Sequence, residues 1–304
     1  MDIILIVIKQ TAIMFLYMLA GYLLIKSKKL TVEGGRGLAV VLVWLIIPVV
    51  IINSFCIECT REKLIELGLS ALLGAIALGL AMLVSRLVFP KKHVEDFAAA
   101  FSNAGFVGIP LVRAVVGEDA VFFLVGFIGM LNIMQTTYGM VLLSGNERKI
   151  GWRDIVINPM LFGVTIGLVI FLSGAGSRMP SVLSGAISGI AATNSPVAML
   201  VLGTYMAQGP VLKLFTEKDG YLVNLWRLLI IPAITIAIFA LLPIDRNIKM
   251  AVLLSASAPV GANVAVYSQM AGADYPYACR LVVLSTLLSI IALPIVSFVG
   301  SLVF

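Results

Sequence analysis

The sequence predicts an all-α membrane protein of ten transmembrane helices, arranged as two inverted five-helix repeats with broken, crossing helices 4 and 9. Composition, ten apolar stretches and a matching pair of interruptions carry this prediction. The 304 residues are 61% hydrophobic and only 12% charged, with a mean hydropathy of +1.11. A soluble domain is nearer half apolar and a quarter charged. Nearly all of the chain is therefore expected to lie in the bilayer.

Ten stretches are long enough to cross the hydrocarbon core, which requires about 20 apolar residues. They lie near residues 3–25, 37–56, 67–89, 97–115, 119–144, 155–174, 181–207, 221–242, 250–270 and 277–303. The first is too long for a cleaved signal and lacks a basic start, so we expect a spanning helix there. The connections are short and charged, and none is long enough for a separate domain.

The lysines and arginines of the loops predict the orientation, because cytoplasmic loops carry an excess of them. Thirteen lie in odd-numbered loops: Lys26, Lys28, Lys29, Arg36, Arg86, Lys91, Lys92, Arg148, Lys149, Arg153, Lys213, Lys218 and Arg280. Six lie in even-numbered loops: Arg61, Lys63, Arg113, Arg178, Arg246 and Lys249. The odd loops are thus expected in the cytoplasm of a multi-pass cell-membrane protein, with both termini outside. The net charge of +6 reflects these loops rather than nucleic-acid binding.

The fourth and ninth stretches are interrupted by helix-breaking residues. Residues 102–110 interrupt the fourth and residues 255–263 the ninth. Glycine and proline weaken helices, and a freed backbone group in hydrocarbon costs several kcal/mol unless something polar meets it. Such breaks survive where they face protein, water or a ligand. The residues expected to form the two crossovers are Gly105, Gly108, Pro110, Pro259 and Gly261.

An internal repeat relates the two halves. Pro48 and Pro196 lie in mid-stretch 148 residues apart, and glycine–acid turns at Gly117 and Gly272 are 155 residues apart. We therefore divide the chain into residues 1–152 and 153–304. Since five is odd, the halves lie in the membrane with opposite orientation, an architecture that is typical of alternating access.

All fifteen acidic residues fall in loops or at the ends of stretches, and the chain has one histidine, His93. Proton relays and metal-dependent or aspartyl membrane enzymes use buried carboxylates or histidines, so we expect no enzyme, no metal site and no cofactor. The lack of buried carboxylates leaves open a sodium site made of backbone carbonyls and hydroxyls. A cavity lined by amides, hydroxyls and helix N-termini suits an anion, and the predicted substrate is a carboxylate.

Four polar side chains, two in the breaks and two on the fifth stretch, are candidate substrate contacts, and a purely structural role is the alternative for each. Asn103 and Asn263 are predicted to bind substrate or shape its site, although Asn103 at a helix start also suits a capping role. Gln135 and Tyr138 on the fifth stretch either contact substrate or join helices by hydrogen bonds.

Two further candidates flank the mid-stretch prolines. Val49 and Val197 are predicted to line the cavity, whereas Pro48 and Pro196 themselves let two helices bend or cross.

Arg227 is expected near an interface, where its long side chain reaches water, with an anion-binding role as the alternative. Cys56 and Cys59 have the spacing of a redox pair or an external disulfide, but incidental cysteines at the membrane edge fit as well.

The run from Asn103 to Leu111, NAGFVGIPL, resembles the fourth-helix crossover of the auxin efflux carrier family. The segment Pro259–Asn263 is similar to the bacterial ninth-helix crossover, and Asn158-Pro159, Pro232 and Pro294 fit the same order. The resemblance spans the chain and implies a carrier of the bile-acid-symporter-like superfamily. It implies a scaffold of helices 1, 2, 6 and 7, and a transport domain of helices 3–5 and 8–10 that moves like an elevator.

The resemblance also implies Asn103 as a substrate ligand. Plant members have a glutamine where this chain has Val260, so Asn263 is the nearby amide here. The expected function is secondary transport, by efflux, of small organic anions such as carboxylates or auxin-like acids. A sodium-coupled symporter and a non-transporting membrane receptor are the alternatives. Pairing of two copies through the scaffold stays open.

Overall fold

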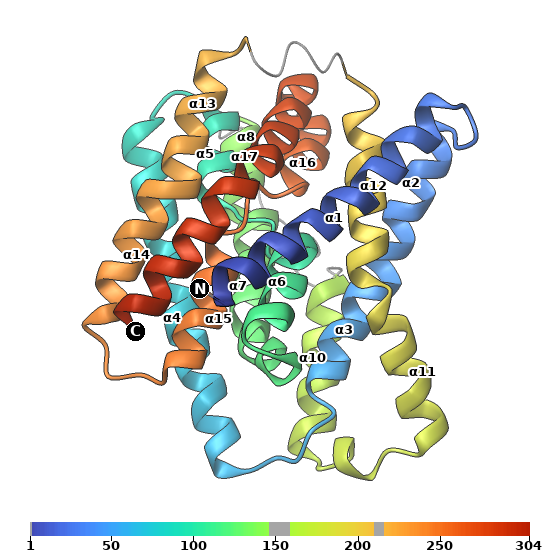
Figure 1. Cartoon of the computed structure of the whole chain (residues 1–304), viewed down its shortest axis with the longest axis vertical. Coiled ribbons are helices and arrows are strands. Elements are labelled where there is room, and N and C mark those ends of the chain that lie inside the picture. The colour runs from blue at the N-terminus through green and yellow to red at the C-terminus, as the bar shows by residue number, and fades with distance from the viewer. Residues whose placement is uncertain (1, 146–158, 210–215) are drawn as a thin grey trace.

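The computed structural model describes residues 2–145, 159–209 and 216–304, and over these ranges the regular structure is helical (Figure 1). Seven segments in the described part are long and apolar enough to span a membrane. They are α1 (Asp2–Lys26); α2 (Val32–Val41) continued by η1 (Leu42–Ile46) and α3 (Ile47–Ser54); α4 (Arg61–Val88); η3 (Glu118–Leu124) continued by α7 (Val125–Met134), η4 (Gln135–Gly139) and α8 (Met140–Leu143); α11 (Ser181–Ala192) with α12 (Asn194–Met206); α13 (Lys218–Leu225) continued by η7 (Trp226–Ile230) and α14 (Ile231–Ala240); and α17 (Tyr275–Val303).

The other helices are shorter. They are α5 (His93–Ala100), η2 (Ala104–Gly108), α6 (Ile109–Val115), α10 (Pro159–Leu172), η5 (Gly176–Arg178), α15 (Arg246–Ala256) and α16 (Asn263–Ala271). The fourth and ninth predicted stretches are those broken into halves. The sixth is seen from Pro159 onward, because its predicted start at 155, Asn158 and the 152/153 division lie outside the described residues.

Wide π-helical turns precede three of the membrane prolines. The turns η1, η2 and η7 end at residues 46, 108 and 230, and Pro48, Pro110 and Pro232 each follow two residues later. A proline donates no backbone hydrogen bond and its ring clashes with the preceding turn. A π turn gives that ring room while the helix continues. These helices therefore continue past their prolines.

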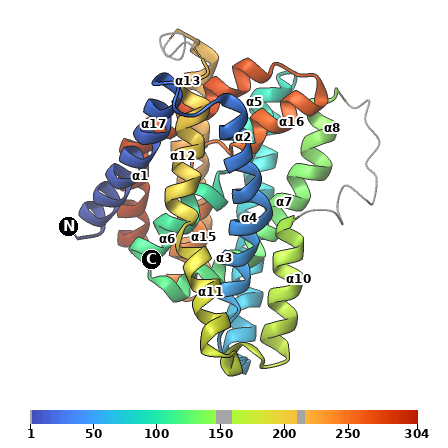
Figure 2. The same cartoon turned by 90° about the vertical axis from the view of Figure 1, so that its right-hand side faces the viewer.

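The helices pack in two groups, which Figure 1 separates to the left and right with α1 crossing in front. The α12 group consists of α1, α2, α3, α10, α11 and α12; in it α1 packs on α12, and α3 packs on α10 and α11 (Figure 2). The α4 group consists of α4–α8 and α13–α17; in it α4 packs on α5, α7 and α15. Helix α1 also contacts α6 and α17, so it lies at the boundary between the groups.

Glycines set the closest helix contact. A Cβ at Gly21 of α1 would collide with the carbonyl of Leu200, and one at Gly203 of α12 with the carbonyl of Met18. Small residues allow such close backbone approach between membrane helices. Large apolar side chains such as Leu5, Val169 and Leu302 are exposed on the outside, as expected for a protein embedded in lipid.

The glycine–acid turns that suggested the repeat have the same unusual backbone. Gly117, between α6 and η3, has φ +126°, and Gly272, between α16 and α17, has φ +71°. Both values lie in the left-handed region that glycine adopts without strain. In each half, the segment that follows the break therefore ends at a glycine turn.

Candidate functional site

The two broken segments cross and pair with each other. Helix α5 ends at Ala100 and helical structure resumes at Ala104, while α15 ends at Ala256 and α16 begins at Asn263. Between them, Ser102 and Val260 form an antiparallel bridge. The breaks are narrower than predicted from residues 102–110 and 255–263, because helix re-forms directly after Asn103 and persists to Ala256.

Backbone hydrogen bonds across the crossing satisfy groups that the breaks set free. Asn103 N donates to Pro259 O at 2.8 Å, and Gly261 N donates to Phe101 O at 3.0 Å. Val260 N donates to Ser285 Oγ at 2.9 Å. A Cβ at Gly261 would lie 3.1 Å from Ser102 O, so glycine permits the two chains to approach this closely.

A small polar cavity of about 20 Å³ adjoins the crossing. Its walls come from both breaks, from the fifth predicted helix and from α10: Ser102, Asn103, Ala104, Gly105, Phe106, Leu131, Asn132, Gln135, Met160, Gly261, Ala262 and Asn263. A buried water needs roughly 10–15 Å³ by this measure. The cavity in this conformation therefore has room for about one water, and a carboxylate requires the walls to separate.

Two buried donors that line this cavity have no hydrogen-bond partner, Ser102 Oγ and Asn103 Nδ2, and the amide of Asn103 is the longer and more adaptable of the two. The side chain of Asn103 is 4% exposed. Although Asn103 occupies the position before η2, its side chain makes no capping hydrogen bond, so the capping interpretation is wrong. A buried amide N–H without an acceptor is costly, and an anionic ligand would supply the acceptor.

Asn263 and Gln135 join the second break to the fifth predicted helix. Asn263 Nδ2 donates to Gln135 Oε1 at 2.8 Å. Gln135 is 1% exposed and opens the π turn η4, which displaces it from the regular helical register. Both predicted amides therefore line the cavity together with Asn103.

Arg227 lies in the interior rather than near an interface, so the expectation for it was wrong. The side chain is 1% exposed. Its Nη1 donates to the carbonyls of Ala99 and Ala100 at 3.1 and 3.2 Å, and Nε donates to Ala258 O at 3.2 Å. These carbonyls end α5 and follow α15, where helix dipoles place partial negative charge. One guanidinium thus holds the C-terminal ends of both broken half-helices.

Two other polar groups in this region are fully buried, and only the second of them, a carboxylate, was unexpected inside the protein. Asn194, at the start of α12, is fully buried, and its Nδ2 donates to Gly105 O at 3.3 Å, which connects the α12 group to the first crossover. Asp96 is also fully buried; Ser85 Oγ donates to its carboxylate at 2.6 Å, and Arg86 lies 3.4 Å away. The expectation that the chain buries no carboxylate is therefore wrong.

The remaining predicted residues lie away from the small cavity. Tyr138, Val49 and Val197 are half-buried and do not line it. Pro48 lies in α3 against Gly163 of α10. Pro196 follows the short interruption between α11 and α12 at Thr193. Neither proline lines the small cavity.

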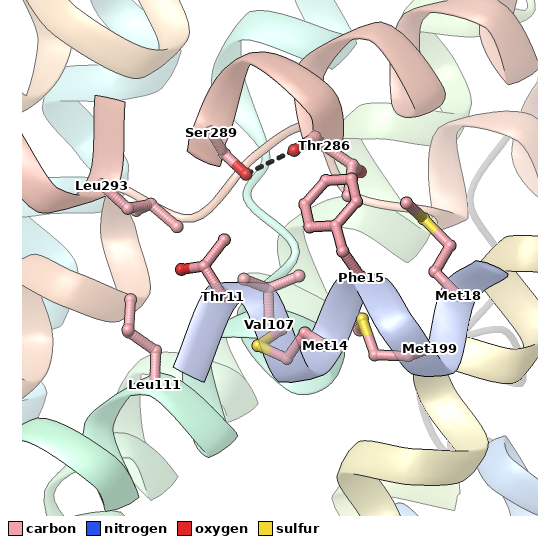
Figure 3. A pocket seen from close by; sticks show the side chains of 10 residues that line it. All are labelled: Thr11, Met14, Phe15, Met18, Val107, Leu111, Met199, Thr286, Ser289 and Leu293. Atoms are coloured by element: carbon pink, nitrogen blue, oxygen red, sulfur yellow. Dashed lines mark hydrogen bonds between the residues drawn. The ribbon is translucent and has the colours of Figure 1, made fainter. Parts of the chain in front are cut away.

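A second, mostly apolar cavity of about 10 Å³ lies between the groups on another side of the crossover (Figure 3). Thr11, Met14, Phe15 and Met18 of α1 face Val107 and Leu111 of the first crossover helix, with Met199 of α12 and Thr286, Ser289 and Leu293 of α17. Methionine is flexible and polarizable and fits irregular gaps. This boundary between the groups is therefore lined by adaptable side chains.

The chain matches the model of a family described as "Membrane transport protein" over residues 6–151 and again over 147–297. The chain belongs to this family. This is the auxin efflux carrier family, which the crossover residues of the chain resemble. Its members are membrane transporters rather than enzymes.

Three curated relatives are also transporters by name. An "Uncharacterized transporter" of Methanothermobacter thermautotrophicus is 28% identical over 66% of this chain and 66% of its own length. Another, of Methanocaldococcus jannaschii, is 21% identical over 85% of each chain. A "Putative malonate transporter" of Rhizobium meliloti is 26% identical over 77% of this chain and 75% of its own length.

Proposed function

We propose that this membrane transporter carries small organic anions such as carboxylates across the cell membrane, by efflux, and binds them at the crossover. The observation that carries the proposal is the buried, unpartnered Nδ2 of Asn103 in a cavity beside two helix N-termini. The first backbone N–H groups of a helix lack intrahelical partners and carry partial positive charge. Together these donors suit a carboxylate, and the name of the Rhizobium meliloti relative makes malonate a natural first probe.

In this proposal the chain forms ten spans as two inverted five-helix repeats. The α12 group serves as the scaffold, and the α4 group moves as the transport domain in an elevator-like motion. The closest helix packing lies within each group, as for α1 with α12 and for α4 with α5 and α7, and this supports the division, as does the methionine-lined boundary between the groups. The cavity of about 20 Å³ corresponds to a conformation in which the groups enclose the site.

Arg227 favours anion transport without sodium over a sodium symporter. Carbonyls at broken helix ends are groups that coordinate sodium in secondary transporters. Here the guanidinium already occupies three of them, from Ala99, Ala100 and Ala258. A fixed positive charge thus replaces the need for a bound cation at these ends.

Uptake of labelled malonate into proteoliposomes preloaded with malonate tests this function. Asn103→Ala removes one hydrogen bond to a charged ligand, which contributes about 1.5–3 kcal/mol and corresponds to roughly 10- to 100-fold weaker binding. Asn224→Ala is the matched control, because Asn224 is a buried amide that donates to Gly220 O and does not line the crossover cavity. Absence of exchange for malonate and other small carboxylates, with equal binding in the two variants, would refute the proposal. Loss of exchange on replacing Na⁺ by K⁺ would instead favour the symporter.

A further inference from the structure

A polar cavity of about 200 Å³ lies at the end of the molecule where α11 begins. We call it the vestibule. It is bounded by the ends of α3 and α11, from the α12 group, and by α6 and η3, from the α4 group. The residues that matter here are Asn53, Cys56, Arg113, Glu118, Asp119 and Ser188. Its volume is many times what one water needs, so it admits a small organic molecule in this conformation, unlike the crossover cavity.

Arg113 connects the vestibule to the crossover. It lies on the same continuous helical segment that begins directly after Asn103, ten residues further on. At about 1.5 Å per residue this separates the two positions by about 15 Å along the helix. Arg113 therefore presents a positive charge to the vestibule about three helical turns from the crossover.

The guanidinium of Arg113 is paired in a way that a ligand can displace. Its Nε lies 2.6 Å from Glu118 Oε2, but the N–H is not directed for a hydrogen bond. The side chain of Arg113 is 25% exposed and that of Glu118 is 59% exposed. Exposed ion pairs contribute little net stability, whereas arginine binds a carboxylate well through two parallel hydrogen bonds.

The opposite wall supplies neutral hydrogen-bonding groups. Ser188 Oγ donates to Asn53 Oδ1 at 3.1 Å, and both residues belong to the α12 group. Asp119 is exposed at the rim and contributes a negative charge, so Arg113 is the group that recognises an anion. We propose that the vestibule is a second carboxylate site, in which Arg113 binds the ligand and Glu118 occupies the guanidinium when the ligand is absent. This proposal rests on the transport function proposed above.

Cys56 provides a native reporter, because it lines the vestibule. Its thiol donates to Ile52 O at 3.3 Å, and burial raises the pKa of the Cys56 thiol, so modification is expected to be slow but measurable. In a Cys59→Ser, Cys279→Ser background, Cys56 is the one remaining cysteine of the chain. Its rate of reaction with anionic and cationic methanethiosulfonate reagents is measured with and without malonate.

We expect the anionic reagent to react faster than the cationic one, because Arg113 lines the vestibule, and malonate to slow modification at least threefold. Arg113→Gln should abolish both the protection and the preference for the anionic reagent. Glu118→Gln should give protection at about tenfold lower malonate, because the competing carboxylate is gone. Arg178→Gln, which removes an exposed charge at the same end, should leave both unchanged. Protection that survives Arg113→Gln would overturn the proposal, as would its absence in the parent protein.

A crossover variant separates this inference from the transport function. Under the proposal, Asn103→Ala keeps malonate protection of Cys56 while exchange falls. Protection that disappears in Asn103→Ala but survives in Arg113→Gln would show a conformational effect of crossover binding, and the vestibule site would be rejected while the transport function stands. Protection that depends on Arg113 without any exchange would support the site and refute the transport function.

Discussion

Replacing Arg227 tests how the crossover is held together. Arg227→Met keeps most of the side-chain volume but removes three hydrogen bonds, to Ala99 O, Ala100 O and Ala258 O at 3.1–3.2 Å. Each buried carbonyl left without a partner costs about 1–3 kcal/mol. Relief from burying the guanidinium offsets part of this cost, so we expect a net loss of about 2–5 kcal/mol. At roughly 2 °C per kcal/mol for a chain above 250 residues, the melting temperature should fall by about 4–10 °C.

Thermal unfolding of the purified protein in detergent measures this effect. Arg246→Met is the control, since Arg246 is exposed and also donates to a backbone carbonyl, that of Ser301 at 2.8 Å; it should shift the melting temperature by no more than about 2 °C. Arg227→Lys should fall between the two, because an ammonium keeps the charge but lacks the planar fork. Equal melting temperatures for Arg227→Met and Arg246→Met would refute the conclusion that Arg227 holds the two broken half-helices together.

Three further changes probe other contacts. Gly203→Ala should lower stability by about 1–3 kcal/mol, because the new methyl group collides with the backbone of α1. Gly189→Ala is the control: it has open space around it and should be neutral or stabilising by up to about 1 kcal/mol. Equal shifts in melting temperature for the two variants would contradict this. A double-mutant cycle of Gln135→Ala and Asn263→Ala should give a coupling of about 0.5–1.5 kcal/mol in thermal stability, and additive effects would show that their 2.8 Å hydrogen bond contributes nothing. Asp96→Asn should lower stability by no more than about 1.5 kcal/mol, because the amide oxygen still accepts from Ser85 as a neutral group while the cost of burying a charge is removed; a loss above about 3 kcal/mol would contradict this.

The breaks could be predicted from the sequence because their cause is local. Glycine and proline act on the backbone wherever they occur, so the interruptions near Asn103 and Asn263 were visible without any knowledge of packing. Their matching positions predicted a shared site, the resemblance to the carrier family implied that they cross, and the backbone pairing of Ser102 with Val260 agrees with a crossing. The exact extent of each break was not predictable, because a π turn lets the helix resume before Pro110.

The role of Arg227 could not be predicted from the sequence, because it depends on long-range contacts. Arg227 is the seventh residue of the apolar stretch 221–242, a position that is equally compatible with a side chain that reaches the interface and with a functional group inside the protein. Its carbonyl partners lie 31 and about 128 residues away in the chain. The burial of Asp96 could not be predicted for the same reason. Asp96 lies near the start of a helix, where carboxylates are usually solvated, but Ser85 and the packing around α5 bury it.

A structure of the protein determined in the presence of malonate tests the central claim most directly. The account predicts ligand density within hydrogen-bonding distance of Asn103 Nδ2, between the helix starts at Ala104 and Asn263, with the small cavity enlarged. Saturating malonate that leaves this cavity empty, or that occupies a site out of reach of Asn103, would contradict it.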